Sequence, residues 1–262
     1  GMGAVMRAIP SKALTLDDLK MPPAVRQLCH ANNGLILVTG KTGSGKSTTL
    51  AALIDDINIR EKGHILTIED PIEFVHPHHR CTVNQRELGT DTYSFPRALK
   101  AVLREDPNVV LVGEMRDLET IAAALTLAET GHLVLSTLHT QDAAHTVDRI
   151  IDVFPPYQQE QIRVMLAASL KGVISQILLP LADGTGRVAA REVLIVTPGI
   201  SAIIREGKTH QIYSAIQTGG REGMCTMEQS LADLVKHGHV AAEDALAKAN
   251  YPEEFRNLAH LA

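Results

Sequence analysis

The chain has 262 residues, enough for one large domain with a buried core. Its 45% hydrophobic and 21% charged residues are typical of a globular protein, and no apolar run reaches the ~18 residues that a membrane-spanning helix needs. The formal net charge of −5 argues against a nucleic-acid motor, which would normally carry a basic stripe.

Short apolar runs alternate with helix-like stretches over the first part of the chain. Strands are predicted at residues 34–40, 64–68 and 108–112 and from residue 133 onward, and helices at residues 46–60, 96–104 and 118–129. Continuous apolar runs are typical of strands that are buried on both faces of a parallel sheet. The alternation therefore predicts an α/β fold, with a parallel sheet flanked by helices.

The pattern changes after Pro155. Residues 158–178 are predicted to form one or two amphipathic helices, and the segments 177–181 and 188–196 flank Ala-Asp-Gly-Thr-Gly as in a β-hairpin. Two helix starts follow, the pair Thr197-Pro198 and the capping box Thr226-Met-Glu-Gln229. We therefore expect a mostly helical C-terminal part.

A glycine-rich motif follows the first predicted strand. Residues 40–47 read G-K-T-G-S-G-K-S and match G-x-x-x-x-G-K-[ST], with a helix after them as the motif requires. In such a loop the backbone N–H groups cradle the phosphates, Lys46 reaches the β and γ phosphates, and the Ser47 hydroxyl ligates Mg²⁺. The motif predicts a site for ATP and Mg²⁺. The predicted nucleotide-binding residues are Gly40, Thr42, Gly43, Ser44, Gly45, Lys46, Ser47 and Thr48.

Acidic residues end two of the predicted strands. Glu114 follows the run Val-Val-Leu-Val-Gly, and Glu69 and Asp70 follow the strand at residues 64–68. A P-loop enzyme needs a carboxylate at the end of a neighbouring strand to hold the metal and orient water. We interpret Glu114 and Glu69 as catalytic candidates, with a helix cap or a solvated turn acid as the alternative for each.

Two groups of histidines need separate interpretations. His132 and His139 flank the fourth predicted strand, and an imidazole at a carboxyl end could sense the γ phosphate or bridge to a carboxylate. A structural role is the alternative there. His76, His78 and His79 lie close together, but a loop or edge strand with this spacing need not bring any two of them together, so a metal site is not favoured.

The arginines and cysteines bear on ion pairs, zinc binding and the redox compartment. Arg104, Arg116 and Arg149 lie near acids and strand ends, where most arginines form surface or interface ion pairs. The three cysteines are far apart and form no C-x-x-C pair. This spacing fits a reducing cytoplasm and excludes a four-cysteine zinc module.

Four segments together resemble the sequence boxes of the secretion and pilus ATPases. The glycine-rich loop is followed by Ile-Leu-Thr-Ile-Glu-Asp-Pro-Ile-Glu-Phe from residue 65, Val-Gly-Glu-Met-Arg-Asp-Leu-Glu-Thr from residue 112 and Ser-Thr-Leu-His-Thr from residue 136. These look like the Walker A, Asp, Walker B and His boxes in the family's order. The resemblance implies a RecA-like P-loop core that hydrolyses ATP to ADP and phosphate. It further implies that Glu114 is the general base, that Glu69 acts in the Asp box, and that His139 with His132 completes the site.

Within this family the chain is most similar to the PilT-like retraction ATPases of type IV pili. Extension and secretion ATPases carry a four-cysteine zinc element, which this chain lacks. The segment Tyr-Ser-Ala-Ile-Gln-Thr-Gly-Gly from residue 213 is similar to one typical of PilT-like proteins. A retraction-linked helix of the family departs here at Ser201 and Ala202, a difference that concerns the output of the motor rather than its chemistry.

The resemblance also implies an assembly and a division of the chain. Family members form hexameric rings in the cytoplasm, associate peripherally with the inner membrane, act on a membrane platform protein in twitching motility, and need no nucleic acid. We expect a remnant of an N-terminal PAS-like domain and linker at residues 1–20, a RecA-like core at 21–180 and a hairpin and helical subdomain at 181–262. Arg7 is the candidate to reach a neighbouring subunit's ATP.

Three alternatives stay open at this point. One is an extension or type II secretion ATPase, and another is a nucleic-acid motor on the same core. The third is a truncated core that binds ATP without efficient turnover, because the trans-acting arginines of the family are mostly missing.

Overall fold

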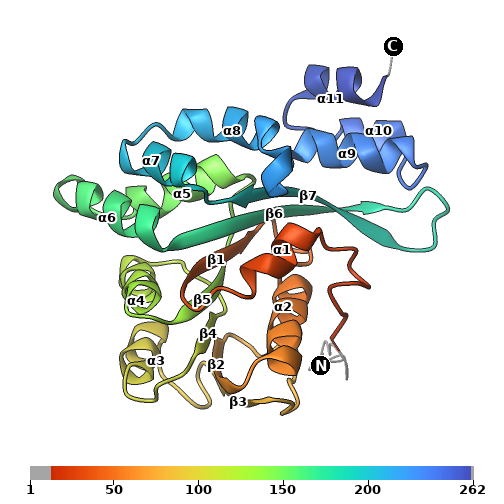
Figure 1. The fold of residues 1–262 in the computed structure, drawn as a ribbon. Helices are drawn as coiled ribbons and strands as arrows, with labels where there is room; N and C mark the ends of the chain where they lie inside the picture. The colour runs from red at the N-terminus through yellow and green to blue at the C-terminus, as the bar shows by residue number, and fades with distance from the viewer. Residues whose placement is uncertain (1–12, 261–262) are drawn as a thin grey trace, which may run out of the picture.

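The computed structural model describes residues 13–260 and places one seven-stranded sheet at the centre of this part of the chain (Figure 1). The strand order is β3-β2-β4-β5-β1-β6-β7, and all neighbours are parallel except the antiparallel pair β6 and β7. The predicted α/β sheet is confirmed. The strands are β1 Gly34–Thr39, β2 Gly63–Glu69, β3 Cys81–Glu87, β4 Val109–Val112, β5 Leu133–Leu138, β6 Leu170–Pro180 and β7 Arg187–Ile195.

Helices cover both faces of this sheet. Helices α1 and α2 pack on one face, α3 to α8 lie over the other, and α9 to α11 pack on the far part of the β6–β7 hairpin (Figure 1). The α-helices are α1 Pro23–Leu28, α2 Lys46–Arg60, α3 Phe95–Val102, α4 Leu118–Glu129, α5 Ala143–Asp152, α6 Pro156–Ser169, α7 Pro198–Arg205, α8 Ile212–Thr218, α9 Met227–Lys236, α10 Ala242–Leu246 and α11 Pro252–Ala259. The short 3₁₀ helices are η1 Thr209–Gln211 and η2 Gly220–Glu222.

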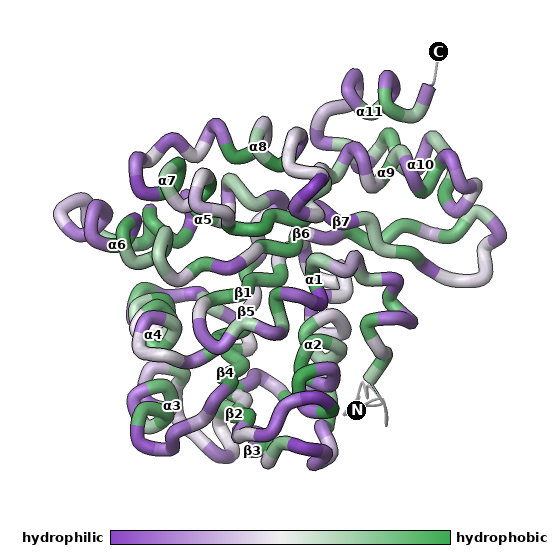
Figure 2. The backbone as a smooth tube through the Cα atoms, viewed as in Figure 1, coloured by the Kyte–Doolittle hydropathy of each residue, from purple (hydrophilic) through white to green (hydrophobic). Residues whose placement is uncertain are grey.

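The central strands are buried on both sides. In β1, Leu35 and Leu37 belong to the core under α3 to α8, whereas Ile36 and Val38 belong to the core under α1 and α2. Successive residues of a strand point to opposite faces, so a strand with helices on both sides must be apolar throughout. Figure 2 shows this as hydrophobic colour along the central strands, with hydrophilic colour mostly on the outer turns.

The structure corrects two sequence predictions. Residues 170–180 are not helical but form β6, which lies between β1 and β7. Of the helical segment predicted at residues 158–178, only the part up to Ser169 is helical, as the end of α6. Residues 81–87, for which no strand was predicted, form the edge strand β3, in which only Cys81 and Val83 are buried. Two inward apolar residues are too few to give a clear period-2 signal.

The C-terminal part shares the sheet with the core. The turn at residues 181–186 connects β6 and β7, and the predicted hairpin is confirmed by pairing from Pro180 and Arg187 back to Gly172 and Ile195. The boundary expected at residue 181 therefore falls between two strands of one sheet. Residues 1–12, with Arg7 and most of the expected PAS-like remnant, lie outside the described residues.

Candidate nucleotide-binding and hydrolysis site

The carboxyl ends of the parallel strands bring the predicted site residues to one edge of the sheet. The glycine-rich loop follows β1, Glu69 ends β2, Glu114 comes two residues after β4 and His139 follows β5. Because these four strands are parallel neighbours, residues that follow their carboxyl ends meet at the same edge. Motifs that are far apart in the chain are thereby brought together.

The loop ends at an open helix N-terminus. Gly45 caps the 15-residue helix α2 with a φ of 89°, a left-handed conformation that favours glycine, and no side chain caps the helix. The first N–H groups of α2 are therefore left for a ligand, at the positive end of the helix dipole. Such an N-terminus fits the phosphates of a nucleotide. Ser47 lies in the first turn of α2, and its hydroxyl makes no hydrogen bond within the described residues, so it is available to a metal ion.

Lys46 lies inside the loop. Its side chain is buried, and Nζ donates to the carbonyls of Gly40 at 2.9 Å and Lys41 at 3.3 Å. Burial lowers the pKa of the Lys46 ammonium, while Glu114 and Glu73 act in the opposite direction. The loop thus holds a partly desolvated cation at the position where the motif requires one.

His139 connects this lysine to the acid at the end of β4. Its Nδ1 lies 3.4 Å from Lys46 Nζ, and its Nε2 lies 3.1 Å from Glu114 Oε1. An ammonium can only donate, so Nδ1 must accept and the proton of a neutral ring belongs on Nε2, facing the carboxylate. The imidazole therefore bridges Lys46 and Glu114 in one tautomer.

Glu114 is held as a carboxylate. Burial raises its pKa, but the hydrogen bond and charge of Arg116, whose Nε lies 2.8 Å from Oε1, act together with His139 and lower the pKa overall. The turn that carries Glu114 is tied to β5, because the Thr137 hydroxyl donates to the Gly113 carbonyl at 2.7 Å and the Met115 N–H donates to the Thr137 carbonyl at 3.2 Å. Glu114 is therefore ionised and fixed beside His139.

Glu69 lies one strand away in a different environment. Oε1 accepts from the Thr67 hydroxyl at 2.7 Å and from Gln85 Nε2 at 3.2 Å. Burial raises the pKa of Glu69, and these two hydrogen bonds only partly oppose it. Gly113 packs against the backbone of Glu69, so the two acidic strand ends are adjacent.

His132 is not part of this group. It precedes β5, its carbonyl accepts from Gly34 N–H at 3.0 Å, and its Nδ1 lies 3.1 Å from the carbonyl of Leu127. The strand β5 lies between it and His139, so seven residue steps separate the two histidines by about 23 Å at ~3.3 Å per residue. The expectation that His132 completes the nucleotide site is therefore corrected: a residue that begins a strand lies at the opposite edge of the sheet.

The remaining polar candidates have local roles. Within residues 13–260 no group of three or more His, Cys, Asp or Glu side chains could hold a metal ion. Arg116 forms the expected ion pair, with Glu114. Arg104 and Arg149 form no ion pair with the part of the chain that the structure describes.

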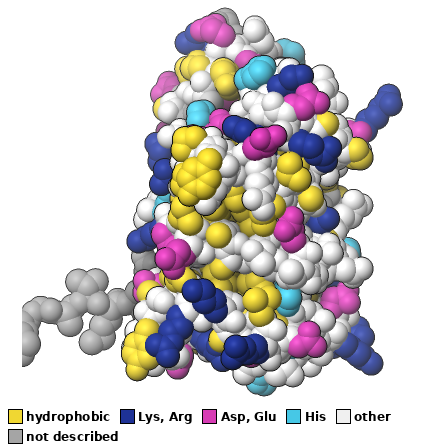
Figure 3. Space-filling view, turned by 90° about the vertical axis from the view of Figure 1, so that its left-hand side faces the viewer, with side chains coloured by type: hydrophobic (Ala, Val, Ile, Leu, Met, Phe, Trp, Pro, Cys, Tyr) yellow, Lys and Arg dark blue, Asp and Glu magenta, His cyan; other side chains and the backbone are white. Residues whose placement is uncertain are grey.

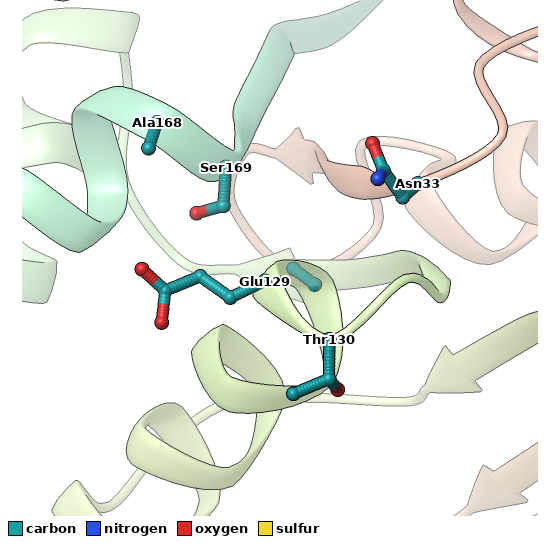
Figure 4. Close-up of a pocket in the computed structure, with 6 residues that line it drawn as sticks. Asn33, Glu129, Thr130, Ala168 and Ser169 are labelled. Atoms are coloured by element: carbon teal, nitrogen blue, oxygen red, sulfur yellow. The ribbon is translucent and has the colours of Figure 1, made fainter.

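A broad cavity lies away from this site. Its volume is about 520 Å³, and its walls come from the end of α4, the residue before β1 and the end of α6 (Figure 4). Asn33, Thr130 and Ser169 all lie near the amino ends of strands, so the cavity opens at the edge opposite the loop. Cavity size does not locate the nucleotide site, which is an open loop on the surface.

A buried glutamine that the sequence motifs do not mark also contacts the site. Gln176 contacts the glycine-rich loop from β6, within a segment that was expected to be helical. No local motif marks it. Only the position of β6 next to β1, which sequence periodicity does not give, could have indicated it.

Comparison with known proteins places the chain in a family. The family model described as "Type II/IV secretion system protein" matches residues 1–188. The chain is 56% identical to the type IV pilus retraction ATPase PilT of Pseudomonas aeruginosa over 97% of its own length and 74% of that protein. It is also 56% identical to a twitching motility protein of Neisseria gonorrhoeae, over 97% of this chain and 68% of that one.

A solved structure agrees with this placement. The pilus retraction motor PilT with bound ADP has a TM-score of 0.89 and 52% sequence identity to the chain, over 95% of this chain and 70% of that one. The sequence match, the RecA-like fold and the assembled loop point to one enzyme class. The chain belongs to the type II/IV secretion system protein family, and within it is a PilT-like ATPase.

Proposed function

We propose that the protein is the Mg²⁺-dependent ATPase of a ring-forming motor that drives type IV pilus retraction. The observation that carries the hydrolytic part is the contact chain from Lys46 through His139 to Glu114 beside the glycine-rich loop. The similarity of the chain to PilT supports the proposed role in pilus retraction. The chain spans about 70% of the relatives it matches, so the activity of the whole motor is a proposal.

The side chains divide the work of hydrolysis. Glu114 is ionised and acts as the general base that orients the attacking water, while His139 holds its carboxylate in place. Lys46 and the N–H groups of α2 stabilise the charge of the phosphates. Ser47 would hold Mg²⁺, which when bound neutralises phosphate charge. We assign Glu69, at the adjacent strand end, to the Asp-box role of orienting groups around the metal and the water.

The motor role requires copies of the chain to contact each other. Figure 3 shows the face that carries α3, α4 and α6, on which apolar side chains gather over the middle and basic ones gather toward the end that carries α3. Tyr157 is 81% exposed and Tyr93 83% exposed, so large apolar groups are available for contact between subunits. We propose a homo-oligomer, hexameric as in the family, in which the nucleotide state moves subunits against each other.

The membrane partner follows from the same assignment. Among residues 13–260 no helix is long and apolar enough to cross a bilayer. We propose that the ring works in the cytoplasm and reaches the inner membrane through the pilus platform protein. No nucleic acid takes part in this cycle.

The test is ATP hydrolysis measured against protein concentration, with and without Mg²⁺. Glu114→Gln should lower kcat by about 10³-fold but leave nucleotide affinity near that of the wild type, because it removes the base and keeps the shape of the side chain. Lys46→Ala should lose nucleotide binding. Glu160→Gln, which changes an exposed acid on α6, is the matched control and should be fully active.

The concentration series tests the ring. Specific activity that rises with protein concentration supports sites completed by neighbouring subunits. Tight ATP binding without turnover at any concentration would instead support a truncated core that only binds nucleotide. Full activity of Glu114→Gln would remove Glu114 from the base role.

A further inference from the structure

Gln176 lies directly behind the glycine-rich loop. Strand β6 is the parallel neighbour of β1 on the side away from β5, and Ser175 pairs with Thr39. Gln176 is therefore level with Gly40, where the loop begins. Gln176 is only 1% exposed, so the hydrogen-bond partners of its side-chain amide must come from the protein itself.

Those partners are the loop and the helix that follows it. Gln176 Nε2 donates to the carbonyl of Ser44 at 2.7 Å, and Oε1 accepts from the Thr49 hydroxyl at 2.9 Å. Ser44 is in the loop, and Thr49 is in the first turns of α2 and 1% exposed. One amide thus links the two segments whose N–H groups would hold the phosphates. Neither a carboxylate, which cannot donate, nor an aliphatic chain can replace both bonds.

The backbone of the glycine-rich loop packs closely against Gln176. A Cβ added to Gly40 would lie 2.4 Å from the Gln176 carbonyl, and one added to Gly45 would lie 3.1 Å from its Nε2. The first distance is a clash with backbone, which cannot move aside. The glycines of the motif therefore serve the contact with β6 as well as the approach of phosphate, and the loop cannot shift without changing its contacts with Gln176.

We propose that Gln176 is a positioning residue of the nucleotide site, which holds the Ser44 peptide and the start of α2 in the conformation that binds phosphate. It does not touch the nucleotide. Preorganised N–H groups bind a charged ligand better because no free energy is spent in ordering them when the ligand arrives. The proposal rests on nucleotide binding at this loop and is independent of the role in pilus retraction.

The test is ADP affinity of the full chain, measured by calorimetry for Gln176→Leu and Thr49→Val. Loss of two neutral hydrogen bonds that order the loop should raise the Kd of Gln176→Leu by about 10-fold, and loss of one should raise that of Thr49→Val less. Hydrogen exchange of the peptide that covers residues 40–50 should become faster in both variants without nucleotide. Lys46→Ala is the reference for a site that has lost binding.

Asn58→Leu is the matched control. Asn58 is another buried amide on α2, but it lies near the far end of the helix, where it bonds Pro77, His79 and Cys81. Its loss should lower stability and leave the Kd for ADP within about twofold of wild type. Equal weakening by Asn58→Leu and Gln176→Leu, or unchanged affinity in Gln176→Leu, would overturn the proposal. If Gln176→Leu does not fold, Thr49→Val decides on the same criteria. Unchanged affinity in Lys46→Ala would instead contradict the nucleotide site itself.

Discussion

Glu114 and Glu69 stand at the ends of neighbouring strands, yet their surroundings move their pKa values in opposite directions. Both carboxyl groups are penalised by burial. At Glu114 the guanidinium of Arg116 and the imidazole of His139 outweigh that penalty, whereas Glu69 has only neutral hydrogen-bond donors. Glu114 therefore stays ionised to lower pH than Glu69 does.

Glu192 allows a test of burial at the scale of one residue. It lies on β7, is 1% exposed, and its Oε1 accepts from the Ala143 N–H at 2.8 Å, where α5 begins. Burial raises the pKa of Glu192 to about 8. In the unfolded chain its pKa is about 4.3, so between these values the folded state keeps a proton that the unfolded state has lost. The free energy of unfolding therefore falls as pH rises through this window.

Glu192→Gln should remove this part of the pH dependence. The glutamine can still accept from Ala143 and does not titrate, so its stability relative to the wild type should increase from pH 5 to pH 8 and level off above that. Urea unfolding at several pH values measures the difference. Glu160→Gln, on the exposed surface of α6, should run parallel to the wild type. A constant difference between Glu192→Gln and the wild type would show that Glu192 is ionised throughout.

At the scale of elements, the starts of two helices could be predicted because capping involves residues only three positions apart in the chain. Thr226 accepts from the Gln229 N–H at 3.2 Å and donates its own N–H to Gln229 Oε1 at 2.9 Å, the capping box that the sequence predicts. Thr197 likewise caps α7 through the Ile200 N–H at 3.3 Å. Ser201 in α7, where the chain departs from the family's helix, donates its hydroxyl to the Ala167 carbonyl of α6 at 2.6 Å. This helix is thereby tied to its neighbour.

Thr226→Ala should destabilise the protein by about 1–2 kcal/mol, since it removes the cap of a helix whose start is buried. The free energy of unfolding in urea, followed by circular dichroism, measures this change. Thr126→Ala provides the control, because that threonine is exposed within α4 and its loss should change stability by less than about 0.5 kcal/mol. Equal effects at both sites would mean that the capping box contributes nothing.

At the scale of the molecule, helices α7 and α8 of the C-terminal part share a buried cluster with the central strands. Ile200, Ile204 and Ile212 lie in the same buried cluster as Leu37 and Val112 of the central strands. Helices α9 to α11 bury a separate apolar cluster against the β6–β7 hairpin, and the sheet that contains this hairpin joins the two clusters. We expect the two parts to unfold together.

Ile204→Ala tests this expectation. Ile204 is fully buried, so its truncation should lower the free energy of unfolding by about 2–4 kcal/mol. Hydrogen exchange in increasing urea should show β1 and α9 losing protection at the same, lowered concentration. Ile59→Ala, at a position 49% exposed on α2, should have a much smaller effect. Early loss of protection in α7 to α9 with β1 still protected would support a separate subdomain at residues 181–262.

Much of the site could be predicted because its chemistry is written in short segments. The loop from Gly40 to Ser47 follows β1, Glu69 ends β2 and Glu114 comes two residues after β4, so each motif lies next to its apolar strand in the chain. β6 could not be recognised in this way. It follows α6 with no loop between them, and Lys171, Ser175 and Gln176 interrupt its apolar residues, so neither a continuous apolar run nor strict alternation marks it as a strand.

The sequence by itself determined the phosphate-binding loop, the acids that end β2 and β4, and the order of the parallel strands' motifs along the chain. The tertiary structure alone decided that His139 meets Lys46 and Glu114 while His132 lies at the opposite edge, and that Gln176 supports the loop from behind. The physical reason is that a strand's neighbours and direction depend on contacts between residues far apart in the chain. Local propensity and motif spacing do not encode those contacts.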